Sequence, residues 1–195
     1  MKYIQYTLVD NKTNKPLSEA PAANGPKTPS GVSPVFAIED SFRTGVPTFY
    51  GTVADDFDIQ SWMREETEDS FYELLKNEYK ERARFKRKQV ERGGVTLPDG
   101  TVLRTDIESQ NRVSSLVVSV NTNPNLLEVD FEANPGEWVS LTRDQAIDIG
   151  MAVSDHVQSC FTWCKGVHGE IEAATKVITD YELIGDKIRD YGQEE

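Results

Sequence analysis

The stretch from residue 88 to 112 constrains the fold more than any other part of the sequence. A charged helical segment enters it, and Gly93-Gly94 ends that helix because glycine is a poor helix former. Residues 95–104 hold two short runs of β-formers around a Pro-Asp-Gly turn, which predicts a hairpin. Thr105, with Glu108 three residues later, has the pattern of a capping box that starts a new helix. Helix, hairpin and capped helix in one supersecondary unit predict mixed α and β structure.

The residues before this stretch indicate a small β module. Three runs rich in β-branched and aromatic residues, 3–9, 35–38 and 48–53, are typical of strands. Five of the nine prolines fall within residues 16–34. Each proline removes a backbone donor and fixes φ, which excludes a helix or a central strand there. We therefore predict an extended, surface-lying proline-rich arm that is held by the body of this protein or by a partner.

A long charged helix is predicted to end near residue 91. Its apolar spacing is consistent with two starts, one at Asp58 and one at Thr67. Acidic residues gather early and basic residues late, an order that suits the helix dipole. We interpret the basic end as a solvated face, with a contact surface for an acidic partner as the alternative. RNA binding is disfavoured because no aromatic residues interleave with the bases.

After the hairpin, apolar spacing predicts helices over 105–120, from 142 to about 174, and over 181–188. Residues 126–131 indicate a short strand or an extended segment, and residues 138–141 a strand that pairs back on it. The C-terminal half is therefore a hairpin joined to helices.

Two features define the longest of these helices. Thr142 and Gln145 form a second capping box at its start. Gly166 and Gly169 lie near its end, and each glycine costs about 1 kcal/mol against alanine in a helix. We expect a kink or a break there.

The predicted fold class is α+β, in three parts. Residues 1–58 form the N-terminal β module with its extended docking arm, residues 59–92 a connecting long helix, and residues 93–190 a domain of hairpin plus helices. Nine residues of the first two parts are predicted to bind a partner. They are Tyr3, Tyr6, Pro26, Pro29, Pro34, Phe36, Phe49, Tyr50 and Trp62.

Composition excludes several classes of protein. The net charge of −12 disfavours nonspecific binding of nucleic acid. No apolar run approaches the roughly 20 residues that a membrane span needs. Apolar residues make up 37% of the chain, below the usual ~45–50%, which favours a partner-dependent protein over a compact enzyme. Two cysteines do not make a disulfide framework, so we expect synthesis in a cytoplasm.

The only pattern that resembles a set of metal ligands is His156, Cys160, Cys164 and His168, spaced four apart. A neighbouring pair can share one zinc ion, but the two histidines lie about 18 Å apart along a helix, so all four cannot. Core packing is the favoured interpretation because cysteine is among the most buried residue types. His156 and Cys160 stay as metal candidates, and no cofactor is predicted.

Catalytic signatures are missing from the sequence. It holds no Gly-x-Ser-x-Gly elbow, no phosphate-binding loop and no dinucleotide fingerprint. We therefore expect a protein that is not an enzyme.

Several motifs together resemble a known family. The run Arg104-Thr105-Asp106-x-x-Ser109-Gln110, then Trp138-Val139-x-Leu141-Thr142, then His156-Val157-Gln158-x-Cys160-Phe161 is similar to an uncharacterised domain of tailed bacteriophages. That domain occurs in tail-fibre and tail-fibre-associated proteins. The resemblance covers about residues 80–185. It implies a virion or tail-assembly role and supplies no catalytic residues.

The expected function is a structural component of a phage tail, near the fibre or baseplate, that acts by protein–protein docking in the virion. The expected partners are neighbouring tail proteins and copies of the chain itself, without nucleic acid or membrane. One alternative is a chaperone of tail-fibre assembly that leaves before maturation. Another is a receptor-binding tip that holds surface sugar through Trp and Tyr residues.

Overall fold

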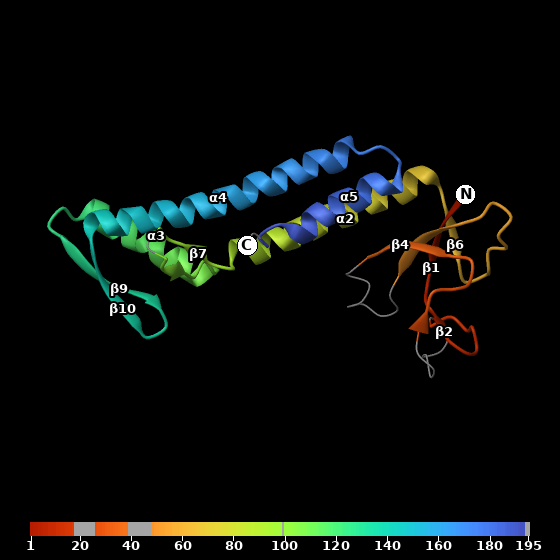
Figure 1. Ribbon diagram of the computed structural model, residues 1–195, viewed down its shortest axis with the longest axis horizontal. Helices are drawn as coiled ribbons and strands as arrows, with labels where there is room; N and C mark the ends of the chain where they lie inside the picture. Colours follow the sequence, from red (N-terminus) through yellow and green to blue (C-terminus); the bar gives the residue numbers. More distant parts are fainter. Residues whose placement is uncertain (18–25, 39–47, 99, 194–195) are drawn as a thin grey trace. The chain divides into compact units, whose positions relative to one another are not determined.

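The computed structural model describes residues 1–17, 26–38, 48–98 and 100–193, and its fold class is α+β, as predicted (Figure 1). In chain order its elements are β1 (Lys2–Tyr6), β2 (Val9–Asp10), β3 (Pro26–Lys27), β4 (Ser33–Ala37), β5 (Phe49–Val53), β6 (Arg64–Glu66), α2 (Glu68–Glu91), β7 (Val95–Thr96), β8 (Val102–Leu103), α3 (Ile107–Thr122), β9 (Glu128–Asn134), β10 (Glu137–Thr142), α4 (Arg143–Ala173) and α5 (Ile178–Asp190).

Contacts divide the chain into two compact units, at positions other than the three predicted parts. Unit 1 comprises Met1–Glu81 and Ile171–Leu183, and unit 2 comprises Arg82–Glu170 and Ile184–Glu195. The division falls within α2, α4 and α5. Each unit is described by itself below.

Unit 1 contains an antiparallel sheet in the order β4-β5-β1-β6. Three of its strands lie where the sequence predicted them. One face is covered by a cluster of buried apolar side chains, namely Ile4, Tyr6, Val32, Val53 and Met63. Pro34 lies in β4, an edge strand, where the missing N–H interrupts no ladder. Residues 18–25 of the predicted arm lie outside the described residues.

The fourth strand corrects the prediction that a helix could begin at Asp58. Arg64–Glu66 forms β6 and pairs with β1, so that Glu66 lies opposite Tyr3. The open edge of β1 and the burial of Met63 decide this conformation against a helical apolar spacing. The alternative start is confirmed, because Thr67 Oγ1 accepts a hydrogen bond of 3.2 Å from the Ser70 N–H at the beginning of α2.

The other face of the sheet packs on α2 through aromatic rings. Phe71, which is fully buried, contacts Tyr3 with ring centroids 4.6 Å apart and Phe36 at 5.4 Å. Phe36 stacks on Tyr50 at 4.7 Å. Further along α2, Tyr72 packs on Tyr181 at 5.9 Å. These contacts hold the C-terminal segment of unit 1 to α2.

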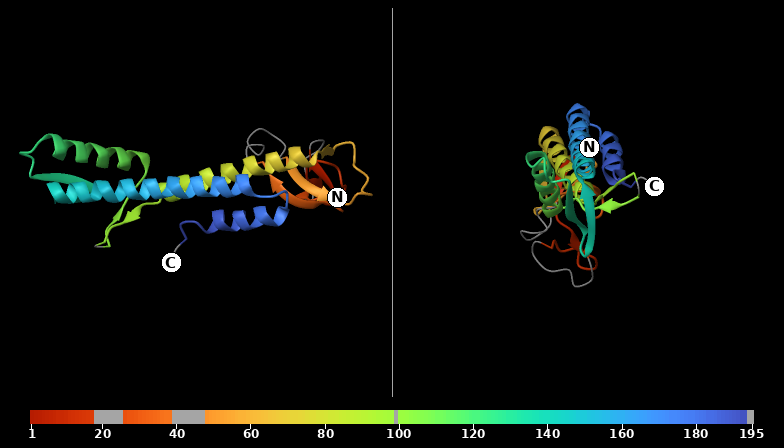
Figure 2. Two further views of the ribbon diagram at one scale, coloured as in Figure 1. Left: turned by 90° about the horizontal axis from the view of Figure 1, so that it is seen from above. Right: turned by 90° about the vertical axis from the view of Figure 1, so that its left-hand side faces the viewer.

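Unit 2 places α3 and its two hairpins against α4 (Figure 2). Both predicted hairpins are confirmed, β7 with β8 and β9 with β10. Its core cluster contains side chains from both hairpins and both helices. The buried members are Leu103, Val113, Leu141, Ile149 and Val153.

Helix α4 begins and continues in ways that the sequence predicted only in part. The second capping box is confirmed: the Thr142 N–H donates to Gln145 Oε1 at 2.8 Å, and the Gln145 N–H donates to Thr142 Oγ1 at 3.3 Å. The break expected at Gly166 and Gly169 is wrong, since α4 runs through both. Within the described ranges, no helix is long and apolar enough to cross a membrane.

Candidate functional site

The joint between the β7–β8 hairpin and α3 is built from the most distinctive motif of the sequence. Thr105 is fully buried, and its Oγ1 accepts a hydrogen bond of 2.9 Å from the Gly94 N–H. Asp106 caps α3, because its side chain accepts bonds of 3.1 Å from the N–H groups of Glu108 and Ser109. The prediction of Thr105 as the capping residue is therefore wrong. The Thr105 hydroxyl is already bonded to the Gly94 N–H, so the next residue, Asp106, caps the helix.

The remaining motif residues complete this joint. The Ser109 hydroxyl donates to Asp106 Oδ2 at 3.0 Å, and an Arg104 guanidinium nitrogen lies 2.9 Å from the same oxygen. Gln110 Nε2 donates to the Thr105 carbonyl oxygen at 2.7 Å. The Ser109 N–H bond and the Arg104 charge hold the pKa of Asp106 below its usual range. The motif thus orders a turn in the chain.

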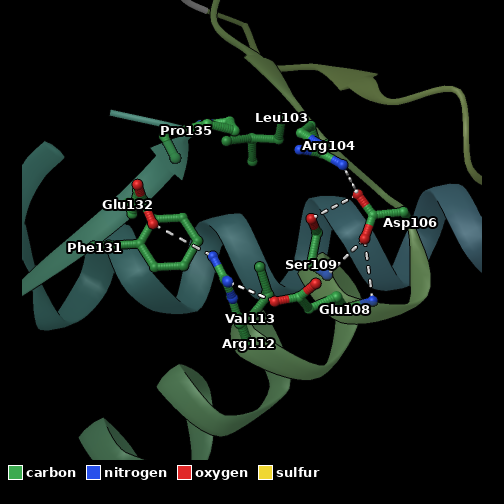
Figure 3. Close-up of a pocket in the computed structure, with 11 residues that line it drawn as sticks. Leu103, Arg104, Asp106, Glu108, Ser109, Arg112, Val113, Phe131, Glu132 and Pro135 are labelled. Carbon is green, nitrogen blue, oxygen red and sulfur yellow. Dashed lines mark hydrogen bonds and ion pairs between the residues drawn. The ribbon is translucent and has the colours of Figure 1, made fainter. Parts of the chain in front are cut away.

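A cavity of about 180 Å³ lies between this joint and β9 (Figure 3). Arg112 contacts two carboxylates there, Glu108 at 2.5 Å and Glu132 at 3.5 Å. Arg104 contacts Asp106, and the Phe131 ring forms an apolar wall. Each of these charged groups has a partner of opposite sign. The ion pair of Arg112 with Glu132 connects α3 to β9. Among the described residues that line the cavity there is no histidine.

A larger groove, of about 600 Å³, lies between α3 and the β9–β10 ribbon. Trp138 lines it with 67% of its surface exposed. The other lining residues are mostly polar: Glu108, Asn111, Arg112, Ser115, Leu116, Ser119, Asp130, Phe131 and Glu132. An indole this exposed is unusual, because Trp is highly buried on average.

The strand register explains why the ribbon has two unlike faces. Phe131 lies opposite Val139 and Val129 opposite Leu141 on the face that packs on the core. The next positions point to the other side, because side chains alternate along a strand. That side carries Glu128, Asp130, Glu132, Trp138, Ser140 and Thr142. We call Glu128, Asp130, Glu132 and Trp138 the acidic face.

The candidate metal residues occupy structural places. Cys160 is fully buried, and burial raises the pKa of the neighbouring thiol of Cys164. His156 Nε2 lies 3.2 Å from the Val90 carbonyl oxygen, which accepts a hydrogen bond from it and ties α4 to α2. In the described ranges, no three His, Cys, Asp or Glu side chains gather in a way that could hold a metal ion.

The nine residues predicted to bind a partner divide between interior and surface. Four are buried within unit 1, namely Tyr6, Pro29, Phe36 and Tyr50. Tyr3, Phe49 and Trp62 are half-buried, and Pro26 and Pro34 are exposed. The structure therefore does not bring them together as one surface, and partner binding by them stays a prediction.

Sequence reasoning missed the acidic face, although a signal for it was present. Glu128, Asp130 and Glu132 recur at every second position, and that period places them on one side of a strand. The sequence left Trp138 open as a core or interface anchor or as a sugar contact, because its exposure depends on how the ribbon packs.

Comparison with known proteins gives one result. No curated protein and no solved structure matches the chain. One family does match, over residues 75–187, a range that contains the joint, the ribbon and all of α4. Since this is more than half of the sequence, the chain belongs to the family described as domain of unknown function (DUF4376).

Proposed function

We propose that this protein is a structural component of a bacteriophage tail, fibre- or baseplate-associated, and that it acts by docking on other proteins. The exposed Trp138 on the acidic face carries this proposal. Trp is enriched at the centres of protein interfaces, where its large ring supplies contact area at a low entropy cost. The resemblance of residues 80–185 to a domain of tail-fibre-associated proteins supports the phage setting.

The chemistry of the cavity beside α3 also favours docking over catalysis. Its guanidinium groups and carboxylates are already paired with one another, as described above. Such a network holds a surface in one shape, which lowers the entropy that ordering costs when a partner binds. The exposed face next to it is therefore preorganised.

A second candidate function is a sugar-binding tip, which one observation favours. The Trp138 ring stands beside a groove with amide, hydroxyl and carboxylate groups, including Asn111, Ser115 and Asp130. Flat apolar rings beside such polar groups are suited to a ligand with both apolar and hydroxyl surfaces. A glycan-array screen with no hits would remove this candidate.

The proposal is tested by quantitative mass spectrometry of density-purified virions from cells that make this protein. We expect the protein at a fixed ratio to known tail proteins. Trp138→Ala should reduce its incorporation, whereas Met151→Ala, which truncates another exposed apolar side chain of unit 2, should not. Presence on tail intermediates but not on mature particles would replace this function by that of an assembly chaperone. Absence from both would refute a tail role.

A further inference from the structure

Helix α3 has a side without charge. Residues 113–127 contain no Asp, Glu, Lys or Arg, although 28% of the chain is charged, a rate at which a stretch of this length would hold about four. Four residues lie on the side of α3 opposite the buried Val113: Ile107, Asn111, Ser114 and Val118. They are four, three and four positions apart, a spacing that places them along one side of a helix. We call these four residues the neutral stripe.

The two aliphatic side chains of the neutral stripe are unusually exposed. Ile107 has 56% of its surface accessible and Val118 has 60%, although Ile and Val are among the most often buried residue types. The two polar residues between them are exposed as well. Glu108 and Arg112, the charged residues of α3, are paired with each other on the flank of the stripe. The stripe is therefore an open surface that offers no charge to a partner.

Hydroxyl groups on this side of α3 already have hydrogen bonds within the helix. The Ser114 hydroxyl donates to the Gln110 carbonyl oxygen at 2.9 Å, and the Thr122 hydroxyl donates to the Val118 carbonyl oxygen at 2.8 Å. Burying a hydroxyl without a partner is unfavourable, but bonds within the helix persist when another surface covers it. Covering this side of α3 therefore leaves neither hydroxyl without a hydrogen bond.

The neutral stripe has the same pattern when it is read in either direction. Aliphatic residues stand at its two ends, polar residues stand in the middle, and the separations of four, three and four are symmetric. If two such helices pack antiparallel about a two-fold axis, Ile107 of one copy faces Val118 of the other, and Asn111 faces Ser114. The Ser114 oxygen, which donates its proton to Gln110, can still accept a bond from the Asn111 amide. Each position then meets a side chain of matching polarity.

We propose that the neutral stripe of one copy of this chain packs antiparallel on the neutral stripe of a second copy. This inference goes beyond the proposed function, because it names a second copy as the partner and a stripe that does not include Trp138. A charged partner is disfavoured because the stripe offers no counter-ion to a buried charge. Each copy has a net charge of −12, so a contact without charged groups also avoids the repulsion between copies. Asp155 of α4, which lines the groove beside Ser114, is exposed and lies at the rim of this contact.

The size of α3 indicates how strong this contact can be. The helix has 16 residues and is about 24 Å long. A contact that covers α3 and half of the groove on each side is about 20 Å wide, so two copies together bury about 1,000 Å². This area is at the lower limit for specific interfaces, so we expect a reversible dimer.

Sedimentation velocity of the full chain tests this proposal. The wild type should shift from monomer to dimer as its concentration rises. Val118→Lys should raise the dissociation constant about tenfold, because an ammonium group then faces the aliphatic Ile107 of the other copy. This variant has a smaller net negative charge than the wild type, so overall repulsion cannot explain a loss of association. Leu183→Lys is the matched control, since it places the same charge at an exposed aliphatic residue of α5, and it should associate like the wild type.

A mixture of two variants tests the antiparallel direction. Ile107→Glu should weaken association as Val118→Lys does. An acid in the first turn of α3 and a base nearer its C-terminus both suit the helix dipole, so both variants should fold. Mixed in equal amounts, the two should associate again, because the introduced carboxylate faces the introduced ammonium while the other pair stays Ile107 with Val118. Parallel packing would place position 107 opposite 107, and the mixture would then show no recovery.

Cysteine cross-linking decides the case if a charged variant fails to fold by circular dichroism. Helix axes about 9 Å apart leave about 4–5 Å between facing Cα atoms, close to the span of a disulfide. Ile107→Cys mixed with Val118→Cys should give a disulfide between the two variants, identified by mass spectrometry of unreduced peptides. The wild type, whose Cys160 and Cys164 are buried, should give none.

Three results overturn the proposal. They are a wild type that stays monomeric up to about 1 mM, a folded Val118→Lys variant that associates like the wild type, and cysteine variants that form no mixed disulfide. None of these results bears on presence in virions or on Trp138, so the proposed function is tested separately.

Discussion

Helices α3 and α4 approach each other closely at Gly150, and adding a single methyl group at that position tests this contact. A Cβ added at Gly150 would lie 2.3 Å from Val117 Cγ2. The same helix contains Gly166, where an added Cβ would meet nothing within 4 Å. Gly150→Ala and Gly166→Ala are therefore the same chemical change on the same helix, and they differ only in what faces the new methyl.

The magnitude follows from two opposing terms. Replacing glycine by alanine inside a helix stabilises it by about 0.8–1.0 kcal/mol. Forcing a methyl into filled space costs about 1–3 kcal/mol. Val117 is β-branched and stiff at χ1 in a helix, so it does not rotate away freely and the cost falls in the upper part of that range. Gly150→Ala should thus destabilise unit 2 by about 1–2 kcal/mol, whereas Gly166→Ala should stabilise it by about 1 kcal/mol.

The change in the free energy of unfolding of unit 2 is measured by urea unfolding, followed by tryptophan fluorescence, in a Trp62→Phe background. The remaining tryptophans, Trp138 and Trp163, both belong to unit 2, so the signal reports that unit. The slope of the free energy of unfolding against urea must agree among the variants, because a changed slope would mean a changed unfolded or native state.

Truncating the Val117 side chain should reverse the sign of the stability change that Gly150→Ala causes. In a Val117→Ala background, Gly150→Ala should stabilise as Gly166→Ala does, which gives a coupling of about 2–3 kcal/mol between positions 117 and 150. If Gly150→Ala and Gly166→Ala shift stability equally within about 0.5 kcal/mol, the close approach of α3 to α4 is refuted.

Two further predictions concern the joint between the hairpin and α3. Thr105→Val removes the acceptor of the Gly94 N–H and should lower the free energy of unfolding by about 1–2 kcal/mol. Thr105→Ser keeps the oxygen and should lower the free energy of unfolding less. Urea unfolding in the same Trp62→Phe background measures both changes. The folded-state pKa of Asp106 is lowered, so its ionised form stabilises the fold at neutral pH, and this contribution disappears as the pH falls below the usual value near 3.8. Asp106→Asn keeps a capping oxygen but cannot ionise, so the gap in melting temperature between wild type and variant should shrink from pH 7 to pH 3; a constant gap would contradict this assignment.

Local chemistry alone determined many of the elements of this protein. The cap at Thr142 with Gln145, the end of α2 before Gly93-Gly94 and both hairpins depend on residues a few positions apart, and the structure has them where the sequence indicates. The acidic residues at every second position of β9 likewise determine which side of that strand is charged, once the strand has formed.

Contacts between distant residues decided the rest. Residues 64–66 form a strand because they pair with the edge of β1. Thr105 does not cap α3 because its hydroxyl accepts a hydrogen bond from the N–H of Gly94, eleven positions earlier in the chain. Trp138 is exposed because the register turns Val129 and Phe131 toward the core instead. Periodicity and capping report only short-range free energies. The burial of a side chain depends on which surface the folded chain places against it. Tertiary packing therefore determined which residues form the candidate site.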